Sequence, residues 1–267
     1  MIASIRTTQP QQIVPVNKKW NPSGLWDLAL DRDSVGGNVS VPNATYSTPA
    51  IINNERAISV TGTTSVDRYN IVDNLNNAQG GALDIGAGDW SMLIRFKYLG
   101  VGNPATCPLF SRWNTGAAPL TCSYIISFDG ANALFFAVMA GSSIIVASKT
   151  SINWTIGRYY TVVATRSGAT INIYRLTHDT KLWESASATN GALTTVNYVA
   201  LNNPMLGSIK VSAGFNTYPS PSLIATFKYA LTESQSKELA NNPWQLFAPV
   251  PTTKYSPSNS GNALLMF

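Results

Sequence analysis

The sequence predicts an all-β domain, a sandwich or a barrel of antiparallel strands, with one helix near its C-terminal end. Three observations lead to this prediction. Short apolar runs with a period of two recur between residues 90 and 229, which is typical of strands that cover a core with one face. Turn residues, mainly Gly and Asn, separate these runs. A single segment after residue 231 has instead the features of a helix.

The strands follow from alternation and from the turns between them. In the segment 90–99 (WSMLIRFKYL), Met92, Ile94 and Phe96 share one face. Two hairpins are expected around the turns at 129–132 and 167–168, because an Asp-Gly and a Ser-Gly pair separate β-rich runs there. The hairpin strands are 123–128 with 133–139, and 159–166 with 169–176. Further strands are expected at 143–148, 196–201, 208–215 and 223–229.

The helix is predicted from its N-terminal cap. Thr232 can cap the first turn, and Gln235 stands at the third helical position, which completes a capping box. The helix should end at about Asn241, because the residue before Pro243 disfavours helical geometry. Trp244, Leu246 and Phe247 then follow, and we expect them to form a hydrophobic plug beneath the end of the helix.

The two ends of the chain differ from its middle. Residues 1–20 show no apolar period and are expected to form an extended N-terminal arm, with one domain over 21–247. Residues 248–267 are rich in Pro, Ser and Asn and end on the apolar stretch 263–267, which predicts either a loose tail or a strand that docks on a partner's sheet edge. Residues 1–17 lack the apolar core of a secretory signal, so we expect folding in a reducing cytoplasm.

Composition narrows the possible functions. Hydrophobic residues make up 45% of the 267 residues and charged residues 12%, about half the usual share of charged residues. This apolar content argues against intrinsic disorder, and no apolar run reaches the ~18–20 residues of a membrane helix. The net charge of +5 is spread along the chain, with Lys18-Lys19 as the only adjacent basic pair, so we expect no nucleic-acid partner.

No set of catalytic residues stands out, and we expect the protein not to be an enzyme. The single His178 follows a strand and is interpreted as an exposed turn residue, and no G-x-S-x-G motif accompanies it. One His also excludes a site with several histidine ligands. Cys107 precedes a proline and has no basic neighbour that would activate a thiolate.

The segment 224–247 (IATFKYALTESQSKELANNPWQLF) resembles the C-terminal end of concanavalin A-like lectin/glucanase domains, the LamG-like jelly rolls. It is most similar to the versions found in tailed-phage and prophage virion proteins. The resemblance spans about residues 20–247 and implies an antiparallel two-sheet jelly-roll sandwich. Glucanases of this superfamily carry an E-x-D-x-E motif on one strand, and this chain has none. The resemblance therefore implies virion structure or glycan binding rather than hydrolysis.

Two groups of residues are candidate binding sites. Arg112, Trp113 and Asn114 combine an aromatic face with polar groups, as sugar-binding sites often do, although packing against the core explains Trp113 better. Asp31 and Asp33 form a D-x-D that could hold a divalent cation, and Asp129 is a weaker candidate. Ordinary turn chemistry explains all three aspartates, so we expect no bound metal, although some LamG-like domains bind calcium at a rim.

These observations favour a non-enzymatic structural protein of a tailed-phage virion: a decoration, collar or tail-associated subunit made in the host cytoplasm. Its expected partners are other virion proteins (capsid, collar or tail) and further copies of the chain. The alternative is a carbohydrate-binding module that attaches to host-surface or environmental glycans. Neither interpretation requires a membrane, a nucleic acid or a cofactor.

Overall fold

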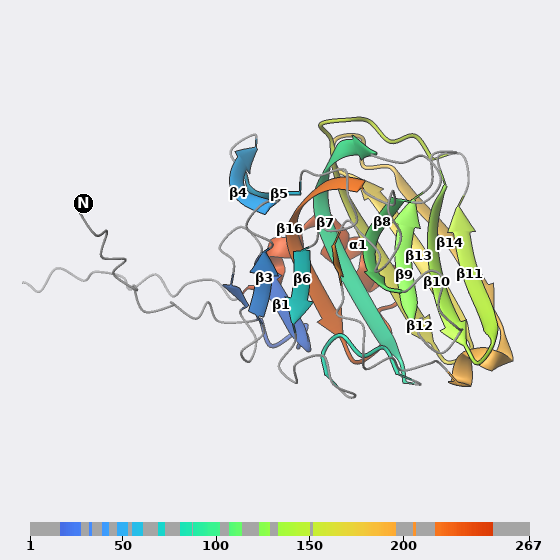
Figure 1. Cartoon of the computed structure of the whole chain (residues 1–267). Coiled ribbons are helices and arrows are strands. Elements are labelled where there is room, and N and C mark those ends of the chain that lie inside the picture. The colour runs from blue at the N-terminus through green and yellow to red at the C-terminus, as the bar shows by residue number, and fades with distance from the viewer. Residues whose placement is uncertain are drawn as a thin grey trace, which may run out of the picture.

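The structure of the chain is a computed structural model. It describes residues 17–27, 32–33, 39–42, 47–52, 55–60, 69–72, 81–86, 88–101, 107–113, 123–128, 133–149, 152–195, 205–206 and 217–247. Within these residues the strands form two seven-stranded sheets and a separate two-stranded sheet. Figure 1 shows the two large sheets as facing layers.

The first large sheet carries the helix on its outer face, and we call it the helix-side sheet. Its strands, in spatial order, are β14 (Trp183–Thr189), β13 (Thr170–Thr177), β12 (Tyr159–Ser167), β7 (Trp90–Val101), β16 (Thr217–Phe227), β1 (Gly24–Asp27) and β2 (Arg32–Asp33).

The second large sheet, which we call the opposite sheet, completes the sandwich. Its order is β11 (Ser143–Lys149), β10 (Leu134–Ala140), β9 (Tyr124–Phe128), β8 (Cys107–Arg112), β15 (Met205–Leu206), β6 (Tyr69–Val72) and β3 (Val39–Pro42). Strands β4 (Ser47–Ile52) and β5 (Glu55–Val60) pair only with each other. The pairings between described strands are antiparallel, which confirms the predicted two-sheet jelly-roll sandwich.

The main core lies between the two sheets and is rich in aromatic rings. Trp90 of β7 is fully buried, with its ring centroid 5.3 Å from Tyr124 and 6.3 Å from Phe136 of the opposite sheet. Phe96 stacks on Phe128 in the same layer, at 6.5 Å. Because β-strands alternate their side chains, these inward residues follow the period of two seen in the sequence.

A second apolar layer attaches the helix. Helix α1 (Glu233–Asn241) buries Leu239 and Ala240 against outward residues of the helix-side sheet, among them Leu93 and Val163. The predicted capping box is confirmed, because Gln235 N donates to Thr232 Oγ1 at 3.2 Å and Thr232 N donates to Gln235 Oε1 at 2.9 Å. In the described part of the chain, no helix is long and apolar enough to cross a membrane.

The predicted plug is confirmed for Leu246 and Phe247 and is wrong for Trp244. The 3-10 turn η3 (Pro243–Leu246) follows α1 and buries Pro243 and Leu246, and Phe247 packs against the same apolar layer, whereas Trp244 keeps 41% of its surface exposed. A one-turn helix directs successive side chains to different sides, so Leu246 packs inward while Trp244 faces outward.

Residues 17–20, the described end of the expected N-terminal arm, pack on this same region. Asn17 N donates to the Leu246 carbonyl at 2.8 Å, and Lys19 lies 2.7 Å from Glu238 of α1. Trp20 is buried in the apolar layer beneath the helix. This part of the chain therefore belongs to the packed domain.

The predicted strands at 90–99, 123–128, 133–139, 143–148, 159–166 and 169–176 are confirmed as β7 and β9 to β13. The two expected at 196–201 and 208–215 lie outside the described residues, as does the turn at 129–132. The last predicted strand begins earlier than expected, at Thr217, and contains Pro219 and Pro221. Register shifts against β7 on either side of the prolines accommodate them.

Candidate functional site

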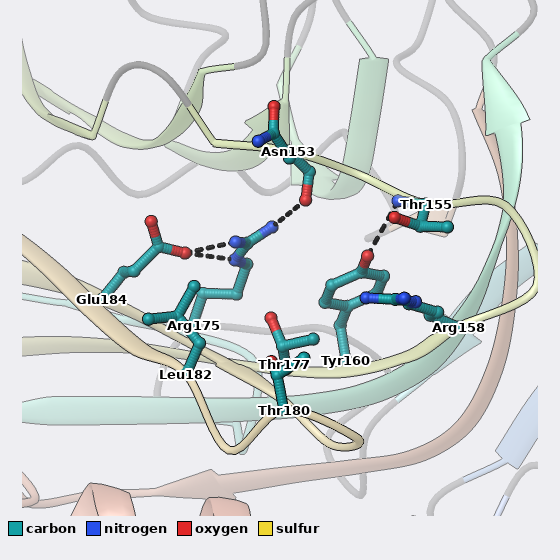
Figure 2. Close-up of a pocket in the computed structure, with 9 residues that line it drawn as sticks. All are labelled: Asn153, Thr155, Arg158, Tyr160, Arg175, Thr177, Thr180, Leu182 and Glu184. Atoms are coloured by element: carbon teal, nitrogen blue, oxygen red, sulfur yellow. Dashed lines mark hydrogen bonds and ion pairs between the residues drawn. The ribbon is translucent and has the colours of Figure 1, made fainter.

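A pocket of about 250 Å³ lies at the end of the helix-side sheet where β12 begins and β13 ends. Its walls come from the segment before β12, from β12 to β14, and from the turn between β13 and β14 (Figure 2). The lining residues are Asn153, Thr155, Arg158, Tyr160, Arg175, Thr177, Thr180, Leu182 and Glu184.

Strand register explains why polar groups meet here. Tyr160 pairs with Thr177 across β12 and β13, and Arg175 pairs with Glu184 across β13 and β14. Directly opposed residues in antiparallel strands share a face of the sheet. Tyr160 belongs to the core between the sheets, so all four side chains lie on the inner face, where the sandwich opens.

Arg175 is held by a carboxylate, a carbonyl and two rings. Its Nε donates to Glu184 Oε2 at 2.8 Å, Nη2 bonds the same oxygen, and Nη1 donates to the Asn153 carbonyl at 2.8 Å. The guanidinium also lies over Trp154, 4.7 Å from the ring centroid, and over Tyr160 at 5.2 Å. Burial lowers the pKa of Arg175 and the Glu184 charge opposes this, but a guanidinium remains a cation at neutral pH.

The remaining polar groups of the pocket are only partly engaged. The Tyr160 phenol oxygen accepts a hydrogen bond from Thr155 N at 2.8 Å, which leaves its own O–H to donate. Thr177 is 4% exposed, and its buried hydroxyl has no hydrogen-bond partner among the described residues. Figure 2 shows this hydroxyl pointing toward the space between Arg175 and Tyr160. A buried hydroxyl without a partner destabilises the free protein and can be satisfied by a ligand.

The rim of the pocket carries a second ion pair. Arg158 Nε lies 2.9 Å from Asp179 Oδ2, and both side chains are close to half exposed. The turn that holds Asp179 is fixed by Thr177 N, which donates to the Leu182 carbonyl at 3.0 Å. The rim is therefore a short ordered turn that faces the segment 152–158.

His178 lies in this turn as predicted, but it is half-buried rather than exposed. Its Nε2 shares a hydrogen bond of 2.8 Å with Thr161 Oγ1 on the outer face of the sheet. Burial, followed by the nearby positive charges of Arg95 and Lys181, lowers the pKa of His178 from 6.5 to about 4, while Asp179 acts in the opposite direction. At neutral pH the ring is therefore uncharged.

This lowered pKa predicts a pH-dependent stability. Between pH 6.5 and about 4 the unfolded chain binds a proton at His178 that the folded protein does not, so the free energy of unfolding should fall as the pH drops through this window. Such a shift is worth about 3 kcal/mol at most, and solvent around the half-buried ring reduces it to about 1–2 kcal/mol. Urea unfolding of wild type and His178→Gln at pH 7, 5 and 4 measures the free energy of unfolding of each. The value for wild type, relative to that of the variant, should fall as the pH is lowered. An NMR titration of the single imidazole near pH 6.5 would contradict this prediction.

Two of the three sequence-predicted sugar residues, Arg112 and Trp113, do not line this pocket. Arg112 ends β8, is 1% exposed and pairs with the inward-facing Tyr124, whereas the half-buried Trp113 packs on the outer face of the opposite sheet against Ile125 and Ala137. The structure therefore does not bring Arg112 and Trp113 together on one face. Asn114 lies outside the described residues, and a role for these three in glycan binding stays a prediction.

The metal candidates are also largely undescribed. Asp31 and Asp129 lie outside the described residues, and Asp33 is placed only by its backbone, in β2 opposite Trp26. Within the described ranges, no group of three or more His, Cys, Asp or Glu side chains could hold a metal ion.

Sequence reasoning missed Arg175, Glu184 and Thr177. One signal was present: Arg175 and Thr177 continue the inward row that begins with Ile171 and Ile173, and a charged residue on an apolar face is unusual. Glu184 gave a weaker signal, because the inward residues that continue its row, Ala186 and Ala188, are small.

Comparisons with known proteins show the fold. No family model matches the chain, and no curated protein matches it. Among solved structures, the CBM40 domain of the Ruminococcus gnavus IT-sialidase, bound to α2,3-sialyllactose, is similar with a TM-score of 0.50 and 11% identity, over 68% of this chain and 95% of that one.

Two other solved structures share the fold. Domain 4 of AbnA, an extracellular arabinanase of Geobacillus stearothermophilus in complex with arabinotriose, has a TM-score of 0.51 and 13% identity, over 86% of this chain and all of that one. The binding domain of botulinum neurotoxin serotype G has a TM-score of 0.56 and 11% identity, over 82% of this chain and 50% of that one. The chain therefore shares the β-sandwich fold of these domains.

Proposed function

We propose that this protein is a non-enzymatic carbohydrate-binding module and that the pocket between β12, β13 and β14 holds the sugar. The observation that carries the proposal is the Thr177 hydroxyl, which is buried at the pocket without a hydrogen-bond partner among the described residues. The similar fold of two domains solved with oligosaccharides supports it, although one fold hosts many functions.

The chemistry of the pocket suits sugar hydroxyls, which both donate and accept hydrogen bonds. Thr177 and Tyr160 supply hydroxyls, and Arg175 supplies N–H donors beyond those it already uses. Both hydrogen bonds from Arg175 to Glu184 use Oε2, so Oε1 is available as an acceptor. These groups are fixed by ion pairing and stacking before a ligand arrives, which lowers the entropy cost of binding.

The virion role predicted from the sequence rests on the sequence resemblance, the low charge, the terminal arms and the absence of a catalytic set in the sequence. The solved structures described above come from a sialidase, an arabinanase and a neurotoxin, and none of these is a virion protein. A glycan-binding module on a virion would satisfy both interpretations. Location in a particle, partner virion proteins and homo-oligomerisation stay predictions that electron microscopy of an intact assembly would test.

We predict that Thr177→Val weakens glycan binding and at the same time stabilises the free protein. The substitution removes a hydroxyl that a sugar would satisfy, which is worth about 0.5–1.5 kcal/mol and therefore about a two- to tenfold loss of affinity. It also removes an unsatisfied buried polar group, so the free energy of unfolding should rise by about 1 kcal/mol. A glycan array would identify a ligand, and calorimetric titration and urea unfolding would measure both effects.

Thr170→Val is the matched control. Thr170 lies on the same strand at its other end, where its hydroxyl bonds Thr189 at 2.9 Å. This variant should bind glycans as wild type does. If Thr177→Val and wild type bind the glycan with equal affinity, the sugar does not lie in this pocket. If no ligand is found on an array of neutral and acidic oligosaccharides, the proposed function itself is contradicted.

A further inference from the structure

We infer that the pocket selects a single neutral sugar unit and discriminates against acidic sugars. This inference rests on the proposed function and names the class of ligand. It follows from three features of the pocket: its balanced charge, its small volume and the kind of polar group left unengaged.

The charges of the pocket cancel in pairs. Arg175 donates twice to the Glu184 carboxylate, and Arg158 is paired with Asp179 at 2.9 Å. Neither guanidinium is therefore a free counter-ion for the carboxylate of a uronic or sialic acid. Lys181 stands in the same turn, but it is exposed and does not line the pocket.

The inner pair is the decisive one, because it lies where a ligand would sit. The side chains of Arg175 and Glu184 are 2% and 15% exposed, so both are largely shielded from water. An acidic sugar in this pocket would bring a second carboxylate close to Glu184 in a medium of low dielectric constant. Like charges repel strongly there, and an incoming charge also loses its hydration.

Besides the remaining N–H donors of the paired Arg175, the groups left unengaged are two hydroxyls and one carboxylate oxygen. They are the Thr177 hydroxyl, the O–H of Tyr160 and Glu184 Oε1. This set matches neighbouring hydroxyls on a sugar ring, each of which can donate and accept. A carboxylate can accept from the two hydroxyls, but it has no proton to donate to Glu184 Oε1.

The volume limits the ligand to about one ring. Pockets that enclose drug-sized molecules have about 300–1,000 Å³, and this pocket has about 250 Å³. We therefore expect it to hold one terminal or exposed monosaccharide unit, with the rest of a chain outside the rim formed by Arg158 and Leu182.

The test compares matched ligands on the intact chain by calorimetric titration. The probes are the methyl glycosides of galactose, glucose and arabinose, the methyl glycosides of galacturonic and glucuronic acid, and lactose beside sialyllactose. We expect the best neutral ligand to bind at least about tenfold more tightly than its acidic counterpart. Its affinity should also change less than twofold between 20 mM and 500 mM salt, since no ligand charge is involved.

Two variants shift the charge balance in a defined direction. Glu184→Gln removes the repelling carboxylate and leaves the Arg175 cation, so the preference for neutral over acidic ligands should narrow by tenfold or reverse. Asp179→Asn likewise removes a carboxylate and leaves a cation, Arg158, at the rim. The Arg158–Asp179 pair is half exposed and contributes little to stability, so this variant folds even if Glu184→Gln is impaired. It should narrow the preference by a smaller factor, about two- to threefold.

The outcomes separate the inference from the proposed function. Suppose that acidic and neutral ligands bind wild type equally tightly and that Thr177→Val loses affinity for both. This result would overturn the inference but would leave the proposal of glycan binding in the pocket intact. Binding of neutral ligands that Thr177→Val and Glu184→Gln both leave unchanged would place the site elsewhere and overturn it as well. Absence of binding to every probe would overturn the inference together with the function on which it rests.

Discussion

Replacing Trp90 with alanine should lower the free energy of unfolding by about 3–5 kcal/mol, the range measured for large aromatic residues in protein cores. Trp90 is fully buried, and its ring contacts Tyr124 and Phe136 of the opposite sheet, so it joins the two sheets. Its loss leaves a cavity that neighbouring rings on fixed strands cannot fill. Urea unfolding followed by fluorescence and by circular dichroism measures the change.

Trp244→Ala is the matched control, because it removes the same side chain from a position that is 41% exposed. Its cost should stay below about 1 kcal/mol, since surface substitutions outside special features cost little. Similar losses in the two variants would show that the core between the sheets does not dominate stability. The comparison also tests the correction made for Trp244, which the sequence had placed beneath the helix.

Strand β7 was predictable because its alternating residues encode it directly, and β10 and β12 were predictable because apolar runs lie beside Gly turns. The sequence alone locates all three to within one or two residues. The helix was predictable for a different reason, since the pair Thr232 and Gln235 marks its first turn chemically.

Other elements had no local signal. Strand β14 (WESASAT) consists mostly of small and polar residues, and its place in the sheet depends on pairing with β13 rather than on its own pattern. The early start of β16 was hidden by Pro219 and Pro221, which disfavour a strand between two neighbours unless bulges relieve the missing hydrogen bonds. Tertiary pairing overrides local preference at both places.

The candidate site was the least predictable part of the molecule. Arg175 and Glu184 are nine residues apart, and only the β13–β14 pairing makes them neighbours. The segment that contributes Asn153 and Trp154 reaches them from before β12, a contact that no sequence period encodes. His178 shows the same limit: its position in a turn was predictable, whereas its burial depends on Thr161 from another strand.

The Arg175–Glu184 pair should show strong coupling in a double-mutant cycle. Glu184→Gln leaves a guanidinium that is 2% exposed without its carboxylate, and breaking buried pairs in this way costs about 3–5 kcal/mol. Because Glu184 is 15% exposed and water can reach its side of the pair, we expect about 2–3 kcal/mol here. Arg175 also keeps its bond to the Asn153 carbonyl, so the pocket wall should stay folded at neutral pH.

Arg175→Met removes the charge and keeps much of the apolar packing on Trp154 and Tyr160. The double variant Arg175→Met with Glu184→Gln should therefore be more stable than the sum of the single changes predicts, by at least about 1 kcal/mol. Strict additivity in urea unfolding would contradict the close pairing. An unpaired buried cation is costly only where water is excluded, so the coupling energy measures how far water is excluded from the pocket. Polar groups interact more strongly with a ligand where water is excluded, and this exclusion is therefore what allows the pocket to select between ligands.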